Sequence, residues 1–272
     1  MVAVIRLAFS TLGCPDWTWD EICAAARDMG LDGIEVRGVG RELYAPAVRE
    51  FRPEQREETM LRLRQAGLSV SLLASAACLG TGRPEAGETE ARRYIDLAAQ
   101  LGVPYIRVMG SEHAAPDVEL DLDAVAYRYS ALCEYGRARG VTPLLETNGL
   151  LADSRAMRRV LDQVASDNRG VLWDVHHPYR FFGETPLETI MRLGDAIRYL
   201  HVKDSVMEKG RVSYQMMGAG DVPVAEAVRR MQERGYDGFI AFEWLKRWCP
   251  DLEEPGIVFY QYAEYVKRLL HR

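Results

Sequence analysis

The sequence has few cysteines, and their spacing fits neither of the usual structural uses of this residue. Five of the 272 residues are cysteine, an odd number without a CxxC pair: Cys14, Cys23, Cys78, Cys133 and Cys249. Disulfide frameworks and structural zinc sites need paired or closely spaced cysteines. The pattern argues against both and favours a reducing cytoplasm.

Other absences exclude whole classes of function. No uninterrupted apolar run approaches the ~18 residues of a membrane span. There is no basic run, and 34 basic against 40 acidic residues give a net charge of −6, which argues against binding to a nucleic-acid backbone. Met1 to Phe9 has no long apolar core or cleavage site, so we expect a first strand there and no export signal. We therefore expect neither nucleic acid nor membrane as a partner.

What the sequence does contain is a repeated unit of helix, glycine and short apolar strand. Glycine just past a helix readily adopts the left-handed conformation that caps the helix end. The clearest copies have their glycine at Gly30, Gly67, Gly102, Gly140 and Gly235. The predicted strands are Arg6–Ser10, Gly33–Val36, Ser69–Leu73, Tyr105–Met109, Thr142–Glu146, Val171–Asp174, Ile197–Val202 and Gly238–Phe242. The predicted helices are Asp20–Met29, Pro53–Ala66, Gly87–Leu101, Asp121–Arg139, Asp153–Ala165, Pro186–Leu193, Val224–Arg234 and Gly256–Leu270.

This alternation predicts an α/β protein with the (β/α)8 barrel fold, a single domain over residues 1–272. A doubly wound sheet is the alternative, but no GxGxxG follows the first strand. The long connections all follow strands and therefore lie at the C-terminal face, where barrel enzymes place their active sites.

At or next to the C-terminal ends of four predicted strands, apolar runs finish in residues that could bind a metal ion. A single carboxylate at a strand end is usually a capping or salt-bridged group, but these strands are consecutive and their side chains can converge. The residues are Glu146, Asp174, His201 and Glu243. Three carboxylates and one imidazole suit Mn²⁺, Mg²⁺ or Co²⁺ better than a thiolate-seeking metal, with Zn²⁺ also possible. We expect one divalent ion, with Mn²⁺ as the first choice.

Five further residues are predicted to bind substrate. Four of them follow from strand alternation, because residues two apart in a strand face the same way. Lys203 shares the face of His201, and Asn148 shares the face of Glu146. Glu35 and Arg37 form a similar pair at the end of the second strand. His177 follows Asp174 by three residues and can turn back over the pocket.

The order of these residues resembles the sugar phosphate isomerase/epimerase family of the xylose-isomerase-like TIM barrel superfamily. The resemblance is carried by Glu146, Asp174-x-x-His177, His201-Val202-Lys203-Asp204, Phe242-Glu243-Trp244, Ala8 to Gly13 and Gly30 to Val36. It implies a metal held by Glu146, Asp174, His201 and Glu243. It also implies that Glu146 and Glu243 transfer protons and that His177 contacts substrate oxygens.

The chemistry of the residues fits an isomerase or epimerase of a sugar or sugar derivative. A divalent cation stabilises the enediolate formed when a proton leaves the carbon next to a carbonyl. Two carboxylates on opposite sides of the substrate could remove the proton and return it.

Departures from the epimerase pattern keep alternatives open. Met207 occupies a position where the epimerases carry arginine, and His201-Val202-Lys203-Asp204 resembles the inosose-dehydratase branch. Lys203 could then polarise a carbonyl or protonate a leaving hydroxyl, so dehydration of a keto-cyclitol or keto-sugar is the second hypothesis. A non-catalytic sugar-binding barrel, or a subunit that needs a partner chain, is the third. The DNA-repair endonucleases of the superfamily fit poorly, because Ala74-Ser75-Ala76 ends the third strand without a histidine.

Two further expectations concern the second half of the chain. Gly218 to Asp221 precedes a helix and could bind an anion, but a plain turn fits better. The last predicted helix carries Phe259, Tyr260, Tyr262 and Tyr265, more aromatic surface than one buried stripe needs, so we expect a homo-oligomer.

Overall fold

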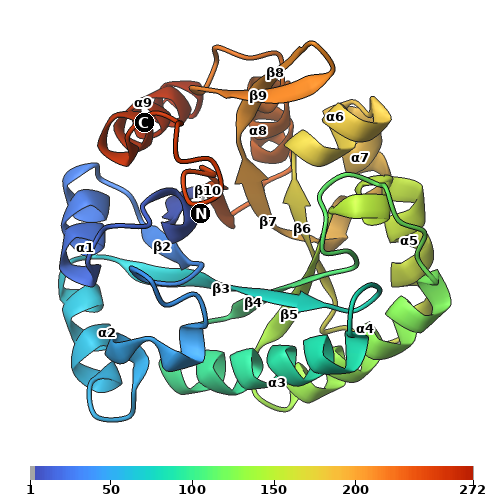
Figure 1. The fold of residues 1–272 in the computed structure, drawn as a ribbon, viewed down its shortest axis with the longest axis horizontal. Helices are drawn as coiled ribbons and strands as arrows, with labels where there is room; N and C mark the ends of the chain where they lie inside the picture. Colours follow the sequence, from blue (N-terminus) through green and yellow to red (C-terminus); the bar gives the residue numbers. More distant parts are fainter. Residues whose placement is uncertain (1–3, 272) are drawn as a thin grey trace. The chain divides into compact units, whose positions relative to one another are not determined.

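The computed structural model describes residues 4–271 and contains a closed barrel of parallel strands (Figure 1). The strand order in the barrel is β1-β10-β7-β6-β5-β4-β3-β2. These strands are β1 (Arg6–Ser10), β2 (Gly33–Val36), β3 (Ser69–Cys78), β4 (Tyr105–Met109), β5 (Thr142–Glu146), β6 (Gly170–Asp174), β7 (Ile197–Val202) and β10 (Phe239–Phe242). The predicted (β/α)8 fold is confirmed.

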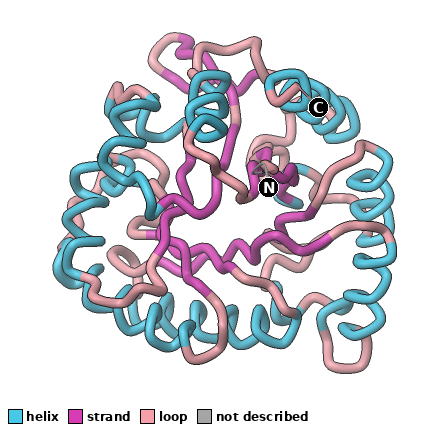
Figure 2. Tube along the Cα trace, turned by 180° about the vertical axis from the view of Figure 1, so that it is seen from behind, coloured by secondary structure: helices cyan, strands magenta, loops and turns pink. Residues whose placement is uncertain are grey.

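Helices follow most of the strands, and Figure 2 shows this alternation along the trace. They are α1 (Trp19–Asp28), α2 (Arg56–Gln65), α3 (Pro84–Leu101), α4 (Leu122–Arg137), α5 (Ser154–Gln163), α6 (His176–Phe182), α7 (Pro186–Leu193), α8 (Val224–Glu233) and α9 (Pro255–Leu269). Among residues 4–271, no helix combines the length and hydrophobicity needed to cross a bilayer. All five cysteines are free thiols.

The five predicted cap glycines adopt the expected conformation. Their φ angles are 62° at Gly30, 72° at Gly67, 69° at Gly102, 69° at Gly140 and 75° at Gly235. Side chains with a Cβ rarely adopt this left-handed region, so glycine is the residue that lets the chain leave each helix and enter the next strand. These glycines therefore mark where five of the helices end and the chain turns toward the next strand.

The chain divides into two compact units, one formed by the chain up to Ser71 with the chain from Leu200 onward, the other by Leu72–Tyr199. In the first, β1 pairs with β2 and β10, and Ser10 lies opposite Glu35 while Phe9 lies opposite Phe242. In the second, β5 pairs with β6, with Glu146 opposite Leu172. The single-domain organisation over 1–272 stays a prediction.

Aromatic side chains pack the core of the first unit. Phe9 stacks on Phe259 with ring centroids 4.2 Å apart, and Phe242 stacks on Tyr262 at 5.0 Å. Phe259 and Tyr262 are fully buried, whereas Tyr260 is 58% exposed. Two of the four aromatics behind the homo-oligomer prediction therefore stabilise α9 against the strands of its own chain.

A buried tyrosine holds two strands of the second unit together. The Tyr129 hydroxyl, on α4, lies 2.9 Å from the carbonyl oxygen of Pro143 and 2.8 Å from that of Gly170. It also accepts the N–H of Gly170 at 2.9 Å. Because Pro143 is on β5 and Gly170 on β6, this hydroxyl ties together the strands that end in Glu146 and Asp174.

The sequence patterns missed a hairpin and the short helix α6 (His176–Phe182). β8 (Asp204–Glu208) and β9 (Arg211–Gln215) pair antiparallel around a two-residue turn. Both turn residues, Lys209 and Gly210, have positive φ, as tight hairpin turns require. The predicted helix from Pro53 begins only at Arg56, because Pro53 lies in the preceding turn.

Candidate functional site

In the unit that contains both chain ends, the predicted metal ligand His201 is hydrogen-bonded to Glu35. His201 lies on β7 and Glu35 on β2, both 0% exposed, with His201 Nε2 2.6 Å from Glu35 Oε2. A carboxylate can only accept a hydrogen bond, so His201 Nε2 carries the hydrogen. The other ring nitrogen, Nδ1, lies 3.6 Å from Glu243 Oε1. In a neutral His201 the lone pair is therefore on Nδ1, and Nδ1 is the atom that could bind a metal ion on the side of Glu243.

Glu243 is held between His201 and Lys203. It follows β10 directly, and its backbone N–H donates to Val202 O on β7 at 3.0 Å. The Lys203 Nζ donates to Glu243 Oε2 at 2.5 Å, and the lysine is only 1% exposed. The two carboxylate oxygens thus have different neighbours: Oε1 faces the imidazole, and Oε2 faces the ammonium group.

Asp204, the residue after Lys203, anchors the following loop. Its Oδ1 accepts the backbone N–H groups of Ser205 at 2.9 Å and Val222 at 3.2 Å. Its Oδ2 accepts those of Gly218 at 2.9 Å and Gly220 at 3.0 Å. A Cβ at Gly220 would lie 2.2 Å from Asp204 Oδ1, so this position requires glycine. The glycine-rich turn therefore binds the chain's own carboxylate.

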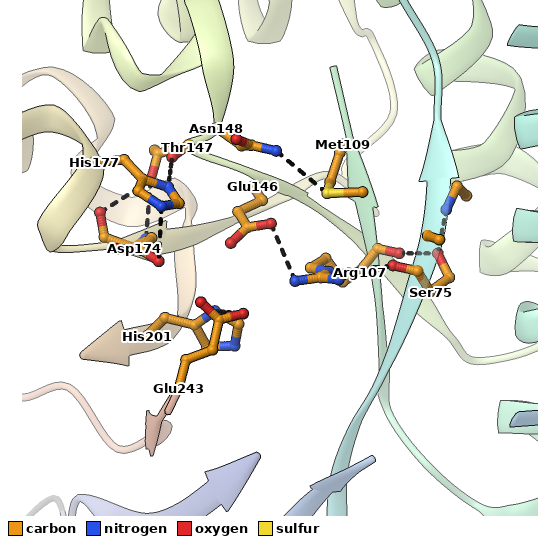
Figure 3. Close-up of polar contacts among 12 residues, drawn as sticks. Ser75, Arg107, Met109, Glu146, Thr147, Asn148, Asp174, His177, His201 and Glu243 are labelled. Atoms are coloured by element: carbon orange, nitrogen blue, oxygen red, sulfur yellow. Dashed lines mark hydrogen bonds and ion pairs between the residues drawn. The ribbon is translucent and has the colours of Figure 1, made fainter. Parts of the chain in front are cut away.

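In the unit Leu72–Tyr199, Asp174 and His177 are held together at the end of β6. The Asp174 N–H donates to Thr147 Oγ1 at 2.9 Å, and His177 Nδ1 lies 2.9 Å from Thr147 O (Figure 3). A carbonyl oxygen only accepts, so His177 Nδ1 carries the hydrogen. His177 Nε2 then faces Asp174 Oδ2 at 3.6 Å. In a neutral histidine this places two acceptors opposite each other, an arrangement suited to a bound cation or hydroxyl between them.

Arg107 is a site residue that the sequence patterns missed. It lies on β4 and is 7% exposed, with Nη1 3.4 Å from Glu146 Oε2 (Figure 3). Its Nε and Nη2 donate to the carbonyl oxygen of Ser75 at 3.2 Å and 3.1 Å. The signal was a lone charge inside the apolar strand Tyr105–Met109. A search for charges at strand ends does not find it, because Arg107 lies in the middle of its strand.

The structure places the remaining predicted substrate contacts as follows. The Arg37 side chain donates to Leu43 O at 3.2 Å, in the loop that follows β2. The Asn148 amide donates to Ser111 O at 3.0 Å and is 4% exposed. Contact with a substrate stays a prediction for both, as it does for His177 and Lys203.

Carboxylate and histidine groups that could hold a metal ion are present. At the start of α6, ligand atoms of Asp174, His176 and His177 lie within 4.8 Å of one another, and all three residues are buried. His176 was not among the predicted residues. Its backbone N–H donates to Asp174 Oδ1 at 2.9 Å. Oxygen and imidazole donors of this kind fit a divalent cation.

Comparisons with known proteins agree with the fold. The family model described as xylose isomerase-like TIM barrel matches residues 23–258. Fructoselysine 3-epimerase from Shigella flexneri is 26% identical over 185 residues, which is 65% of this chain and 64% of the relative. The chain thus matches less than two thirds of that relative's length.

Solved structures show the same fold at low sequence identity. The probable 3-DHS dehydratase AsbF from Bacillus anthracis superposes with a TM-score of 0.76 at 16% identity, covering 97% of this chain and 99% of the other. The IOLI protein with a binding zinc atom gives a TM-score of 0.79 at 13% identity, covering 98% of each chain.

Proposed function

The chain belongs to the xylose isomerase-like TIM barrel family, and we propose that it is a divalent-metal-dependent isomerase or epimerase of a sugar or sugar derivative. The observation that carries the proposal is the arrangement around His201. Glu35 holds Nε2, so Nδ1 is left on the side of the Glu243 carboxylate, where an ion could bind both. The similarity to a fructoselysine 3-epimerase supports the substrate class.

We assign the ion to Glu146, Asp174, His201 and Glu243. In a (β/α)8 barrel the C-terminal strand ends open on one face. Glu146 and Asp174 end β5 and β6, His201 is the second-to-last residue of β7, and Glu243 directly follows β10. All four are buried, and their side chains have the donors that could hold a metal ion. Mn²⁺ is our first choice, because three carboxylates and one imidazole suit a hard divalent cation; Mg²⁺, Co²⁺ and Zn²⁺ are the alternatives.

When bound, the cation would supply charge that stabilises an enediolate form of the substrate. Glu243 takes a proton from the carbon next to the carbonyl, and Lys203 holds Oε2 of that carboxylate in place. Glu146, which faces Arg107, starts protonated and gives its proton to the enediolate; Glu243 then releases its proton to solvent and Glu146 takes one up, which restores both groups. His177 contacts substrate oxygens through Nε2, because Thr147 holds its Nδ1.

Lys203 favours a second candidate function, dehydration of a keto-sugar or keto-cyclitol. The same proton abstraction by Glu243 would be followed by loss of a neighbouring hydroxyl, which needs a proton to leave as water. The buried Lys203 ammonium, 2.5 Å from Glu243, is a group that could donate it. The resemblance of the fold to a probable dehydratase is in line with this reading.

Incubation with Mn²⁺ in deuterated water tests the proposal against its alternative. The substrates would be a panel of ketoses and cyclic keto-polyols, followed by mass spectrometry and proton NMR. An isomerase or epimerase incorporates deuterium next to the carbonyl without changing the molecular formula otherwise. A dehydratase yields a product lighter by one water. Absence of both exchange and turnover across the panel would contradict the proposal and favour a sugar-binding barrel or a subunit that needs a partner chain.

A homo-oligomer also stays part of the proposal, now supported mainly by the exposed Tyr260 on α9. Light scattering at micromolar concentration tests it. A mass near 30.7 kDa would show a monomer and remove this part of the proposal.

A further inference from the structure

Glu35 is buried with no solvent contact, and its carboxylate has one hydrogen-bonding partner at close range. Glu35 is 0% exposed, and Oε2 lies 2.6 Å from His201 Nε2. Within the described part of the chain, the other oxygen, Oε1, makes no hydrogen bond. Burying a carboxylate costs several kcal/mol unless strong interactions offset it, so the contact with His201 is the feature to explain.

A purely stabilising role explains the contact poorly. A buried ion pair often stabilises a fold no better than apolar residues of similar volume would. Its neighbours on β2, Ile34 and Val36, are apolar and fully buried on the opposite face of the strand, so Glu35 is the one charged residue of this short strand. A carboxylate at this position has a specific consequence that an apolar side chain lacks: it decides which nitrogen of His201 carries the hydrogen.

That choice determines which nitrogen of His201 carries the lone pair that a metal ion could bind. A neutral imidazole has one N–H and one lone pair. With Nε2–H donating to Glu35, the lone pair is on Nδ1, 3.6 Å from Glu243 Oε1. Histidines that bind metals commonly donate their second N–H to a carboxylate, which orients the ring and strengthens the ligand.

We propose that Glu35 is a positioning residue that sets His201 to bind the metal ion through Nδ1. The inference rests on the proposed function, because it presumes that His201 is a ligand. This role replaces the expectation that Glu35 contacts the substrate, because Glu35 acts on the ion through His201. Substitution of Glu35 should therefore change the affinity for the metal ion and leave substrate binding at saturating metal unchanged.

The test compares Glu35→Gln and Glu35→Met with the wild-type protein. Glutamine keeps an oxygen that can accept from Nε2–H, whereas methionine has a similar volume and no such acceptor. Glu54→Gln, in the exposed turn before α2, is the matched control. Mn²⁺ affinity is measured on the metal-free proteins from the electron paramagnetic resonance signal of free Mn²⁺. Circular dichroism and urea unfolding check that each variant is folded.

We expect Mn²⁺ affinity to fall by about 10–100-fold in Glu35→Met, less in Glu35→Gln and not at all in Glu54→Gln. If Glu35→Met fails to fold, Glu35→Gln decides the question, with an expected loss of a few-fold to about 10-fold. At saturating Mn²⁺, the KM for the substrate found in the panel of ketoses and cyclic keto-polyols should stay unchanged in the folded Glu35 variants. A raised KM with unchanged metal affinity would overturn the inference and return Glu35 to substrate binding.

A second readout does not depend on activity. In Zn²⁺-loaded wild-type protein labelled with ¹⁵N-histidine, His201 should show a metal-shifted Nδ1 and a retained Nε2–H. A metal-bound Nε2, or Mn²⁺ affinity unchanged in both Glu35 variants, would refute the inference and leave the proposed function standing. Wild-type protein that binds neither Mn²⁺ nor Zn²⁺ would refute the proposed function itself, and the inference with it.

Discussion

The substitution Asp204→Asn should destabilise the protein strongly although it changes one atom. The Asp204 carboxylate accepts four backbone N–H groups, two on each oxygen. Asparagine keeps one acceptor oxygen and replaces the other with an NH₂ group. The NH₂ group is itself a donor, and in either orientation of the amide it faces two backbone N–H groups. These are the N–H groups of Ser205 and Val222 in one orientation and of Gly218 and Gly220 in the other.

The expected loss follows from the two hydrogen bonds that cannot form. Hydrogen bonds to charged groups contribute about 1.5–3 kcal/mol each, so the free energy of unfolding should fall by about 3–6 kcal/mol. That is a large part of the 5–15 kcal/mol typical of a folded domain. Because Asp204 is 1% exposed, water cannot replace the lost acceptor without opening the loop.

Urea unfolding followed by circular dichroism measures this change, with Asp251→Asn as the control. Asp251 is exposed, and the same substitution there should change the free energy of unfolding by less than about 0.5 kcal/mol. A loss below about 1 kcal/mol for Asp204→Asn, with an unchanged m-value, would refute the reasoning that this carboxylate anchors the loop.

Three further predictions concern the site and a buried thiol. Glu243→Gln and Glu146→Gln should each lower turnover by about 10²–10⁴-fold while the protein stays folded, because an acid–base group is lost; near-native turnover in either variant, with metal bound, would remove that residue from the acid–base pair. Asp174→Ala and His201→Ala should each lose most of the bound metal, as measured by elemental analysis, and full metal content in both would count against the assigned ligands. Burial raises the pKa of Cys133 to about 12, so its thiol should resist Ellman's reagent at pH 8 until urea unfolds the chain. Rapid labelling of Cys133 in the folded protein would contradict the burial argument. Because the pKa of this thiol is raised in the folded state, its contribution to the free energy of unfolding is fully present below the pKa of an unfolded thiol, near 8.5. That contribution is lost as the pH rises toward about 12.

The barrel could be predicted because its signals are local. Each cap glycine, such as Gly102 or Gly235, needs only its own helix end to adopt positive φ, and each apolar strand can be recognised from its own residues. The β8–β9 hairpin was missed because Lys209-Gly210 is a weaker turn signal than the asparagine–glycine pairs usually sought. The sequence predicts Pro53 as a first helical residue, but Pro53 lies in the turn before α2, because proline suits such a turn equally well.

The site could be predicted only in part, because strand alternation gives the direction of a side chain and not its partner. Glu35 and Arg37 share a direction in the sequence pattern, yet Glu35 meets His201, and Arg37 reaches the loop at Leu43. The contact between Arg107 and Glu146 depends on the register of β4 against β5, which no local pattern encodes. In α9, the sequence pattern predicts more aromatic surface than one buried stripe needs, yet Phe259 and Tyr262 are fully buried, because the pattern does not show which face the strands cover.

Anomalous diffraction at the manganese edge, from crystals grown with Mn²⁺, tests the central claim most directly. We predict a single strong peak coordinated by Glu146, Asp174, His201 through Nδ1, and Glu243. A peak held by Asp174, His176 and His177 without His201 and Glu243, or no peak at these residues, would contradict the assigned metal site and the proton chemistry built on it.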